Sequence, residues 1–457
     1  MSNRKIKDLT KGSVPKLLWV FSIPILFSNI FETVNSSINT MWVGRFLGDS
    51  ALAATINANF IIFLMFSLVF GFGLAASTYI GRYIGMGELE NARKFFGTAI
   101  GATAILSIVS SALGFYYCDF ILNKLSTPKE VILQASIYSK AIFVALPPNL
   151  ILWVIMLSLR GIGDSMTAMW YMVITVVLDA IFNPLLIGGL YGFPKLGIGG
   201  SGCATAIANY GSLILLCIHL YVRKSPLCLR DHQLSYLFTR WFALKRMVSK
   251  GVPICLQMLF LASSGLIMIS FVNKEGASVL ASYNIALQLW MYLQMPAMAV
   301  SSAVGAMVAQ NIGAGLWERV FLVSRWGVFI CIAMSCSLLA IFFLFGENIL
   351  SLFFTNGAGA KEIAYAKHIQ YLASWSYILF GIATIFMATL RSNGIVMLPL
   401  VVVFLAVYPV RIGFYYFSYH YLGADAIWIS FPVGALFCLV VTYGYYLTDH
   451  WRKHETI

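Results

Sequence analysis

Two similar stretches decide how this chain is organised: GRYIGMG at residues 81–87 and AQNIGAG at residues 309–315. They are 228 residues apart, which is half of the 457-residue chain. Further identical pairs occur at the same offset: Leu52 and Leu280, Ala53 and Ala281, Ala58 and Ala286, and Glu90 and Glu318. We therefore predict a duplicated chain. Internal repeats of this kind are characteristic of membrane transporters.

The composition indicates a membrane protein. Hydrophobic residues make up 60% of the chain, charged residues only 10%, and the mean hydropathy is +0.84, whereas soluble domains have about 25% charged residues. A membrane-spanning helix needs roughly 20 apolar residues. Twelve such stretches are present, at 16–44, 51–81, 94–122, 133–158, 166–190, 198–222, 246–273, 279–309, 321–346, 365–389, 396–419 and 423–447.

Six of these stretches fall in each half. The sequence thus predicts an all-α integral membrane protein with twelve transmembrane helices in two pseudo-symmetric six-helix lobes. We expect an N-terminal lobe at 1–222, a cytoplasmic linker at 223–245 and a C-terminal lobe at 246–457. The linker is the most polar long interruption between apolar stretches.

The distribution of Lys and Arg predicts the orientation. Short loops rich in these residues stay in the cytoplasm, and 21 of the 30 fall on the side that holds both termini. We therefore expect a multi-pass protein of the cell inner membrane with both termini cytoplasmic and no cleaved signal peptide. The same asymmetry explains the net charge of +13, so no nucleic-acid partner is expected.

The sequence contains no catalytic motif that we can identify. Its eight cysteines have no CxxC spacing and its six histidines form no HExxH pair. GxSxG and Walker glycine loops are also missing from the sequence. We therefore expect neither an enzyme nor an ATP-driven pump, and no cofactor.

Two acids stand well inside apolar stretches, Glu32 and Asp179. A charge in the hydrocarbon is costly, so each is a candidate functional group. Asn35, Ser36 and Asn39 follow Glu32 at helical spacing and share its face. Similarly, Asn183 follows Asp179 by one helical turn.

Such a site could bind Na⁺, because hard cations favour carboxylate and amide oxygens. It could equally carry H⁺, because burial favours the protonated form of a carboxylate. We predict ion coupling by Asp179, Asn183, Glu32 and Asn39, with Asp179 and Asn183 as the metal ligands if the ion is Na⁺. The alternative is that these groups only hydrogen-bond one another between helices.

The second half has no comparable acid. Its polar candidates are Gln257, Asn284, Gln288 and Gln294, with the cation Arg411. Together with Asn35 and Ser36, the four amides are candidates for a substrate cavity. They could equally bond each other.

The chain resembles the multidrug and toxic compound extrusion (MATE) transporters of bacteria along essentially its whole length. The resemblance rests on the two repeats together with NTMWVGRFLG at 39–48, LRGIGDS at 159–165, LDAIFNPLLIGG at 178–189, GIGGSGCATAIA at 197–208 and LRSNG at 390–394. It implies twelve helices in two lobes around a V-shaped cavity. It also implies alternating access and export of cationic, amphipathic compounds in exchange for Na⁺ or H⁺.

The chain departs from the family pattern at the site of interest. Many bacterial members carry Asp where Asn39 stands, and Asn followed by Asp-Pro where this chain has Asp179 and then Asn183-Pro184. Glu32 could replace the missing first-helix acid. Many relatives also carry Arg near the position of Gln288. The absence of this positive charge here would favour a cationic substrate.

We therefore predict a secondary active multidrug exporter, acting by antiport with Na⁺ or H⁺. Its partners would be small organic cations and the lipid bilayer, and we expect a monomer. The alternative is a flippase or exporter of a lipid-linked or other anionic substrate. A non-transporting membrane scaffold is a less favoured interpretation.

Overall fold

The computed structural model describes residues 8–124, 131–238, 240–344 and 360–453. Within these ranges the secondary structure is helical, without strands. Twelve of the described helices are long and apolar enough to cross a membrane, which confirms the predicted fold class.

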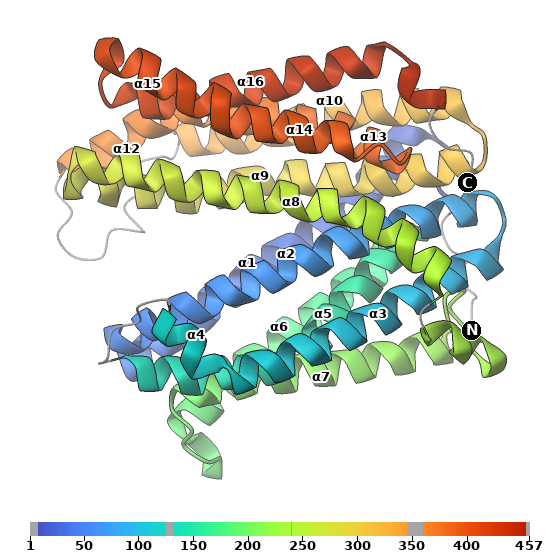
Figure 1. Ribbon diagram of the computed structural model, residues 1–457, viewed down its shortest axis with the longest axis horizontal. Helices are drawn as coiled ribbons and strands as arrows, with labels where there is room; N and C mark the ends of the chain where they lie inside the picture. The colour runs from blue at the N-terminus through green and yellow to red at the C-terminus, as the bar shows by residue number, and fades with distance from the viewer. Residues whose placement is uncertain (1–7, 125–130, 239, 345–359, 454–457) are drawn as a thin grey trace. The chain divides into compact units, whose positions relative to one another are not determined.

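The first half of the chain contributes seven α-helices (Figure 1). They are α1 (Val14–Leu47), α2 (Asp49–Gly85), α3 (Leu89–Tyr116), α4 (Cys118–Lys124), α5 (Ile132–Gly161), α6 (Ser165–Gly188) and α7 (Ile198–Val222). Two short 3₁₀ helices follow α6 and α7, η1 (Leu190–Gly192) and η2 (Asp231–Leu237).

In the second half, two of the spans are interrupted. The helices are α8 (Trp241–Val272), η3 (Asn273–Glu275), α9 (Ala277–Gly313), α10 (Trp317–Leu344), α12 (Ala360–Ala373), α13 (Trp375–Ser392), α14 (Met397–Leu405), η4 (Ala406–Val410), α15 (Arg411–Leu422), α16 (Asp425–Leu447) and η5 (His450–Lys453). The tenth span is α12 and α13, which break at Ser374, and the eleventh is α14, η4 and α15.

The helix boundaries repeat at the sequence offset. Adding 228 to the bounds of α2, 49 and 85, gives 277 and 313, the bounds of α9. Adding 228 to those of α3, 89 and 116, gives 317 and 344, the bounds of α10. The repeat in sequence is therefore also a repeat of local structure.

The described residues form two compact units. One holds residues 27–255; the other holds residues 9–26 and 256–457, so α1 and α8 each contribute to both. In the first unit α5 packs against α2, α3 and α7. Its apolar window is 78% buried, as expected of a central helix that is hydrophobic on all sides. In the second unit α13 occupies the corresponding place, against α9, α10 and α16.

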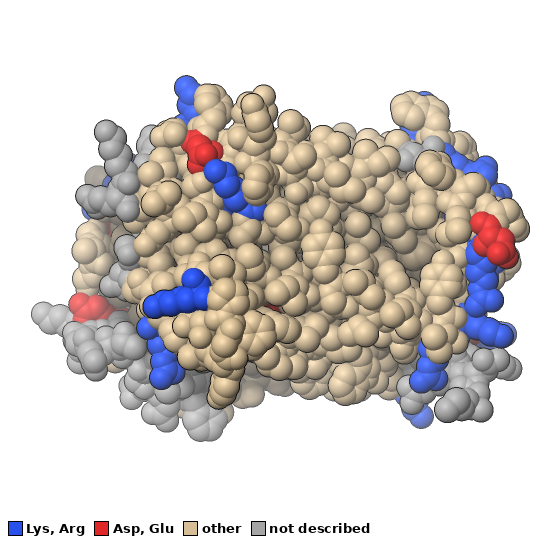
Figure 2. All heavy atoms as spheres, turned by 90° about the horizontal axis from the view of Figure 1, so that it is seen from below, with Lys and Arg blue, Asp and Glu red and all other residues tan. Residues whose placement is uncertain are grey.

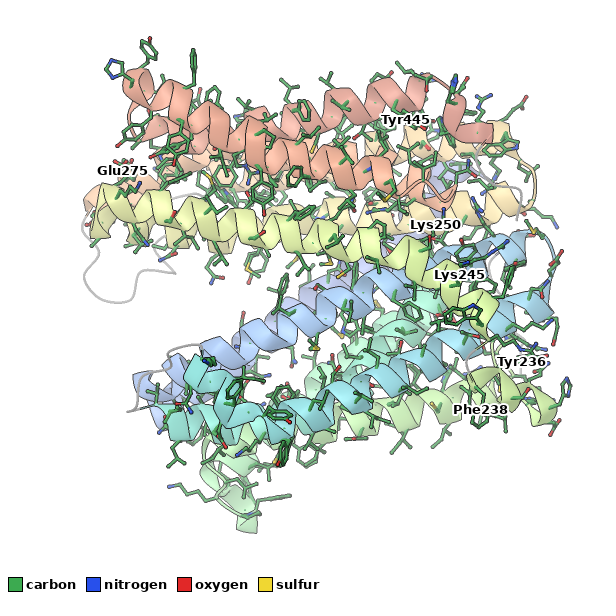
Figure 3. All side chains as sticks on the ribbon, viewed as in Figure 1. Tyr236, Phe238, Lys245, Lys250, Glu275 and Tyr445 are labelled. Carbon is green, nitrogen blue, oxygen red and sulfur yellow. The ribbon has the colours of Figure 1, made fainter. Side chains whose placement is uncertain are left out.

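One face of the molecule carries its charges away from the middle of the spans. Figure 2 shows one face on which Lys, Arg, Asp and Glu gather toward the two ends and leave a wide band almost free of charge. Within the second unit, Glu275 and Tyr445 lie at opposite ends (Figure 3). An uncharged band of this kind is suited to contact with lipid tails.

The linker segment η2 is docked onto α3. Tyr236, labelled in Figure 3, donates its phenol hydrogen to the carboxylate of Glu90, and Gln233 Nε2 donates to the same carboxylate at 3.2 Å. Two glycines of α3 make the close approach possible. A Cβ at Gly97 would lie 2.7 Å from Tyr236 Cβ, and one at Gly101 would lie 2.8 Å from the carbonyl carbon of Leu237.

Candidate functional site

Local sequence signals define the helix that carries Asp179. The side chain of Asp164 caps the start of α6 by accepting a hydrogen bond from the Thr167 amide at 3.0 Å. Gly189 ends the helix with φ of 70°, a conformation that glycine adopts without strain. Both residues belong to motifs identified in the sequence, LRGIGDS and LDAIFNPLLIGG.

Asp179 is almost fully buried, with 1% of its surface exposed, and it accepts hydrogen bonds from three helices. Asn39 Nδ2 on α1 donates to Oδ2 at 2.8 Å. Asn183 Nδ2, one turn further along α6, donates to Oδ1 at 3.0 Å, and Thr205 Oγ1 on α7 donates to Oδ1 at 3.2 Å. Asn35 of α1 also interacts with this carboxylate.

A second hydrogen bond closes the cluster. Asn183 Nδ2 also donates to Asn39 Oδ1, at 2.7 Å. The predicted grouping of Asp179, Asn183 and Asn39 is therefore present in the structure, and α1, α6 and α7 are joined by it. The tight packing of α7 on α6 depends on Gly200, where a Cβ would lie 2.5 Å from the carbonyl oxygen of Leu186.

The cluster has spare oxygen atoms. Asn183 Oδ1 and Asn35 Oδ1 are buried and accept no hydrogen bond from the described residues. An unpaired buried polar atom is costly, and a cation coordinated by these oxygens and by Asp179 would satisfy it. The donors are a carboxylate and amide oxygens, which suit a hard cation or a proton better than a transition metal.

Glu32 lies apart from this cluster. It is half-buried on α1, and the charge with which it interacts is that of Arg160 on α5. Among the described residues it has no hydrogen bond to Asp179. The α1 groups at the Asp179 carboxylate are the amides Asn35 and Asn39, whereas Glu32 interacts with Arg160.

Sequence reasoning did not single out three residues near these acids. Thr205 donates to Asp179, Arg160 faces Glu32, and the phenol of Tyr138 on α5 is close enough to Asp179 for an electrostatic interaction. Thr205 stands in the quoted GIGGSGCATAIA stretch, one turn after Ser201. The sequence signal that could have identified Thr205 was a hydroxyl side chain inside an apolar membrane span.

The predicted residues of the second half fall into two groups. Gln257 Oε1 accepts a hydrogen bond from Arg391 Nη1 at 3.4 Å, so it is held near the end of α13. Asn284, Gln288 and Gln294 lie on one exposed face of α9, together with Met291 and Met298. Ser36 of α1 is likewise exposed.

Twelve spans, a structural repeat and a buried carboxylate among amides are features of membrane transporters. The MatE family model matches residues 24–185 and 253–417. The chain belongs to the MATE family, as the resemblance in sequence indicated.

Individual relatives are also similar over most of the chain. The probable multidrug resistance protein YoeA of Bacillus subtilis is 33% identical, over 98% of this chain and 96% of that protein. The multidrug export protein MepA of Staphylococcus aureus is 25% identical, over 86% of this chain and 85% of that protein. The fold is similar to that of an outward-facing multidrug resistance MATE family transporter, with TM-score 0.89, 20% identity and coverage of 99% and 100%.

Proposed function

We propose that this chain exports small molecules across the inner membrane in exchange for a cation, Na⁺ or H⁺, that binds at Asp179. The observation that supports the proposal is the buried carboxylate with two unpaired amide oxygens beside it. No described Lys or Arg forms an ion pair with Asp179, so a bound cation or proton would complete its charge balance.

Ion binding at this position would act on three helices at once. Asn39 is on α1, Asp179 and Asn183 are on α6, and Thr205 is on α7. Coupling requires that the ion favours one conformation over another by its differential affinity. A cation that holds α1 against α6 and α7 would favour the conformation in which these helices are joined, and its loss would release α1.

We propose that the lobes at 1–222 and 246–457, joined by the linker 223–245, alternate in access around the substrate. Both termini would be cytoplasmic and the protein a monomer. The substrates would be organic cations of amphipathic character, since Gln288 carries no charge and the exposed face of α9 combines amides with methionines. Ser36, exposed on α1, and Asn35 would contribute from the other half.

Efflux from proteoliposomes tests this proposal. The wild type should export a fluorescent organic cation under an imposed Na⁺ or H⁺ gradient, and the effective gradient identifies the ion. Asp179→Asn should abolish this transport. The matched control is Asp119→Asn, which removes an exposed carboxylate at the start of α4 and should leave transport unchanged.

If the folded wild type exports no organic cation under either gradient, the alternative of a lipid-linked or other anionic substrate is favoured. Equal transport by wild type and Asp179→Asn would refute the assignment of the ion site.

A further inference from the structure

The second unit contains a half-buried cation, Arg411, that the proposed mechanism does not use. Arg411 is the first residue of α15, near the middle of the span Met397–Leu422. Its guanidinium forms no ion pair with a carboxylate of the described residues. A charge at this depth is expected to have a partner or a function.

The hydrogen bonds of Arg411 are few. A guanidinium has five N–H donors, and the one hydrogen bond that its side chain makes within the described part of the chain is from Nη1 to Ser264 Oγ, at 3.3 Å. Its Nε is buried without an acceptor. The guanidinium also lies over the ring of Phe431, 4.4 Å from the centroid. That contact leaves the N–H groups unpaired.

A second unpaired donor meets the same ring. Trp290 of α9 is 1% exposed, its ring centroid is 5.2 Å from that of Phe431, and its indole Nε1 has no acceptor among the described residues. Arg411 and Trp290 therefore bring two buried, unsatisfied N–H groups to the same phenyl ring, that of Phe431. Tyr283 and Tyr377 are close enough to Arg411 for electrostatic interaction.

The backbone beside Arg411 is also unusual. Pro409 has no N–H, so the helix cannot form its regular hydrogen bond there. Residues 406–410 instead form a turn of π-helix, a feature often found at functional sites. Across from it, Gly434 of α16 has no side chain. A Cβ at this position would lie 3.7 Å from Arg411 Nε and 3.1 Å from the carbonyl oxygen of Ala406, so a side chain here would press on the π-helical turn beside the guanidinium.

We propose that Arg411 and the indole N–H of Trp290 form a binding site for a monovalent anion within the second unit. The donor set consists of N–H groups with a full positive charge and no competing carboxylate, which is the chemistry that recognises a halide or a carboxylate. The anion comes either from solution, as a halide, or from the carboxylate of an organic molecule. This site is separate from the cation site at Asp179, which belongs to the first unit.

Binding can be measured without transport. The melting temperature of the purified protein in an uncharged detergent is followed while sodium isethionate, a large reference anion without a carboxylate, is replaced by sodium chloride or sodium benzoate. Because the Na⁺ concentration is constant, the Asp179 site makes no contribution. A ligand that binds only the folded state raises the melting temperature in a saturable way.

We expect saturable stabilisation of the wild type and a half-saturation concentration at least tenfold higher in Arg411→Gln. Arg411→Lys should retain the response because it retains the charge. Arg391→Gln, which removes another arginine of the same unit, is the matched control and should respond as the wild type does. Saturation by chloride alone identifies a halide site, and saturation by benzoate identifies a carboxylate site.

No saturable response to either anion in the wild type would overturn the proposal, as would an unchanged half-saturation concentration in Arg411→Gln. If Arg411→Gln does not fold, Trp290→Phe decides, since it keeps an aromatic ring and removes the N–H. A several-fold higher half-saturation concentration in Trp290→Phe supports the site, and an unchanged one contradicts it.

Discussion

Replacing Gly101 by alanine should loosen the linker segment η2 from α3. The new Cβ would lie 2.8 Å from the carbonyl carbon and 3.3 Å from the Cα of Leu237. These are backbone atoms, so no side-chain rotation relieves the overlap and η2 must move. Such a movement would weaken the hydrogen bonds of Tyr236 and Gln233 to Glu90.

The expected cost follows from these contacts. Overpacking a tight site costs about 1–3 kcal/mol. The free energy needed to open η2 from α3 should therefore fall by this amount. Since about 1.4 kcal/mol corresponds to a factor of ten, the population of the open linker should rise by roughly 5- to 150-fold. Proteolysis follows that population when closing is faster than cleavage.

Limited trypsin digestion measures the opening. Cleavage after Arg230 and Arg240, which flank η2, should be faster in Gly101→Ala by the stated factor, with sites identified by mass spectrometry. Gly265→Ala is the matched control, because a Cβ there meets nothing within 4 Å and alanine is favoured over glycine in a helix. Cleavage of Gly101→Ala at the rate of the wild type would refute the argument that this glycine is required for docking.

Two further predictions concern single side chains. Thr205→Val removes a hydrogen bond that favours the ionised form of the Asp179 carboxylate. It should change the apparent affinity for the coupling ion by about tenfold or more, and if that ion is H⁺ the affinity should rise. The change is measured from the ion dependence of efflux, and an unchanged affinity would exclude Thr205 from the site. Asp119 lies outside the spans, and the Ser136 hydroxyl, followed by the Lys140 ammonium, holds the pKa of its carboxyl below the usual range. Since the lowered pKa contributes stability above the unfolded value of about 3.9, Asp119→Asn should lower the free energy of unfolding at pH 7 by less than about 1 kcal/mol. This difference should disappear as the pH falls below that value, and thermal unfolding that shows the same difference in acid would contradict the assigned cause.

The number and order of the helices could be predicted because hydrophobic length is a property of each segment alone. The offset of 228 residues even places the bounds of α9 and α10. The break after α3 was not predicted. The apolar run continues past Tyr116 into Leu122, so composition gives no sign that α3 ends at Tyr116 and α4 begins at Cys118.

The part of the site that lies on a single helix could be predicted from the sequence. Asp179 and Asn183 are one turn apart in sequence and meet in space. The choice between Glu32 and Asn39 as the neighbour from α1 depends on how that helix is rotated against α6, and residue spacing does not contain this information. Thr205 was missed for the same reason, because its contact with Asp179 joins α7 to α6.

The role of Asp179 is tested most directly by measuring, at equilibrium, whether substrate binding releases the coupling ion. If Asp179 binds the coupling ion and substrate favours the other conformation, each must lower the affinity of the other by the same factor. Adding a fluorescent organic cation to purified protein loaded with Na⁺ or H⁺ should release about one ion per protein in the wild type and in Asp119→Asn, and none in Asp179→Asn. Equal ion release from folded Asp179→Asn would contradict the claim that this carboxylate couples the ion to export.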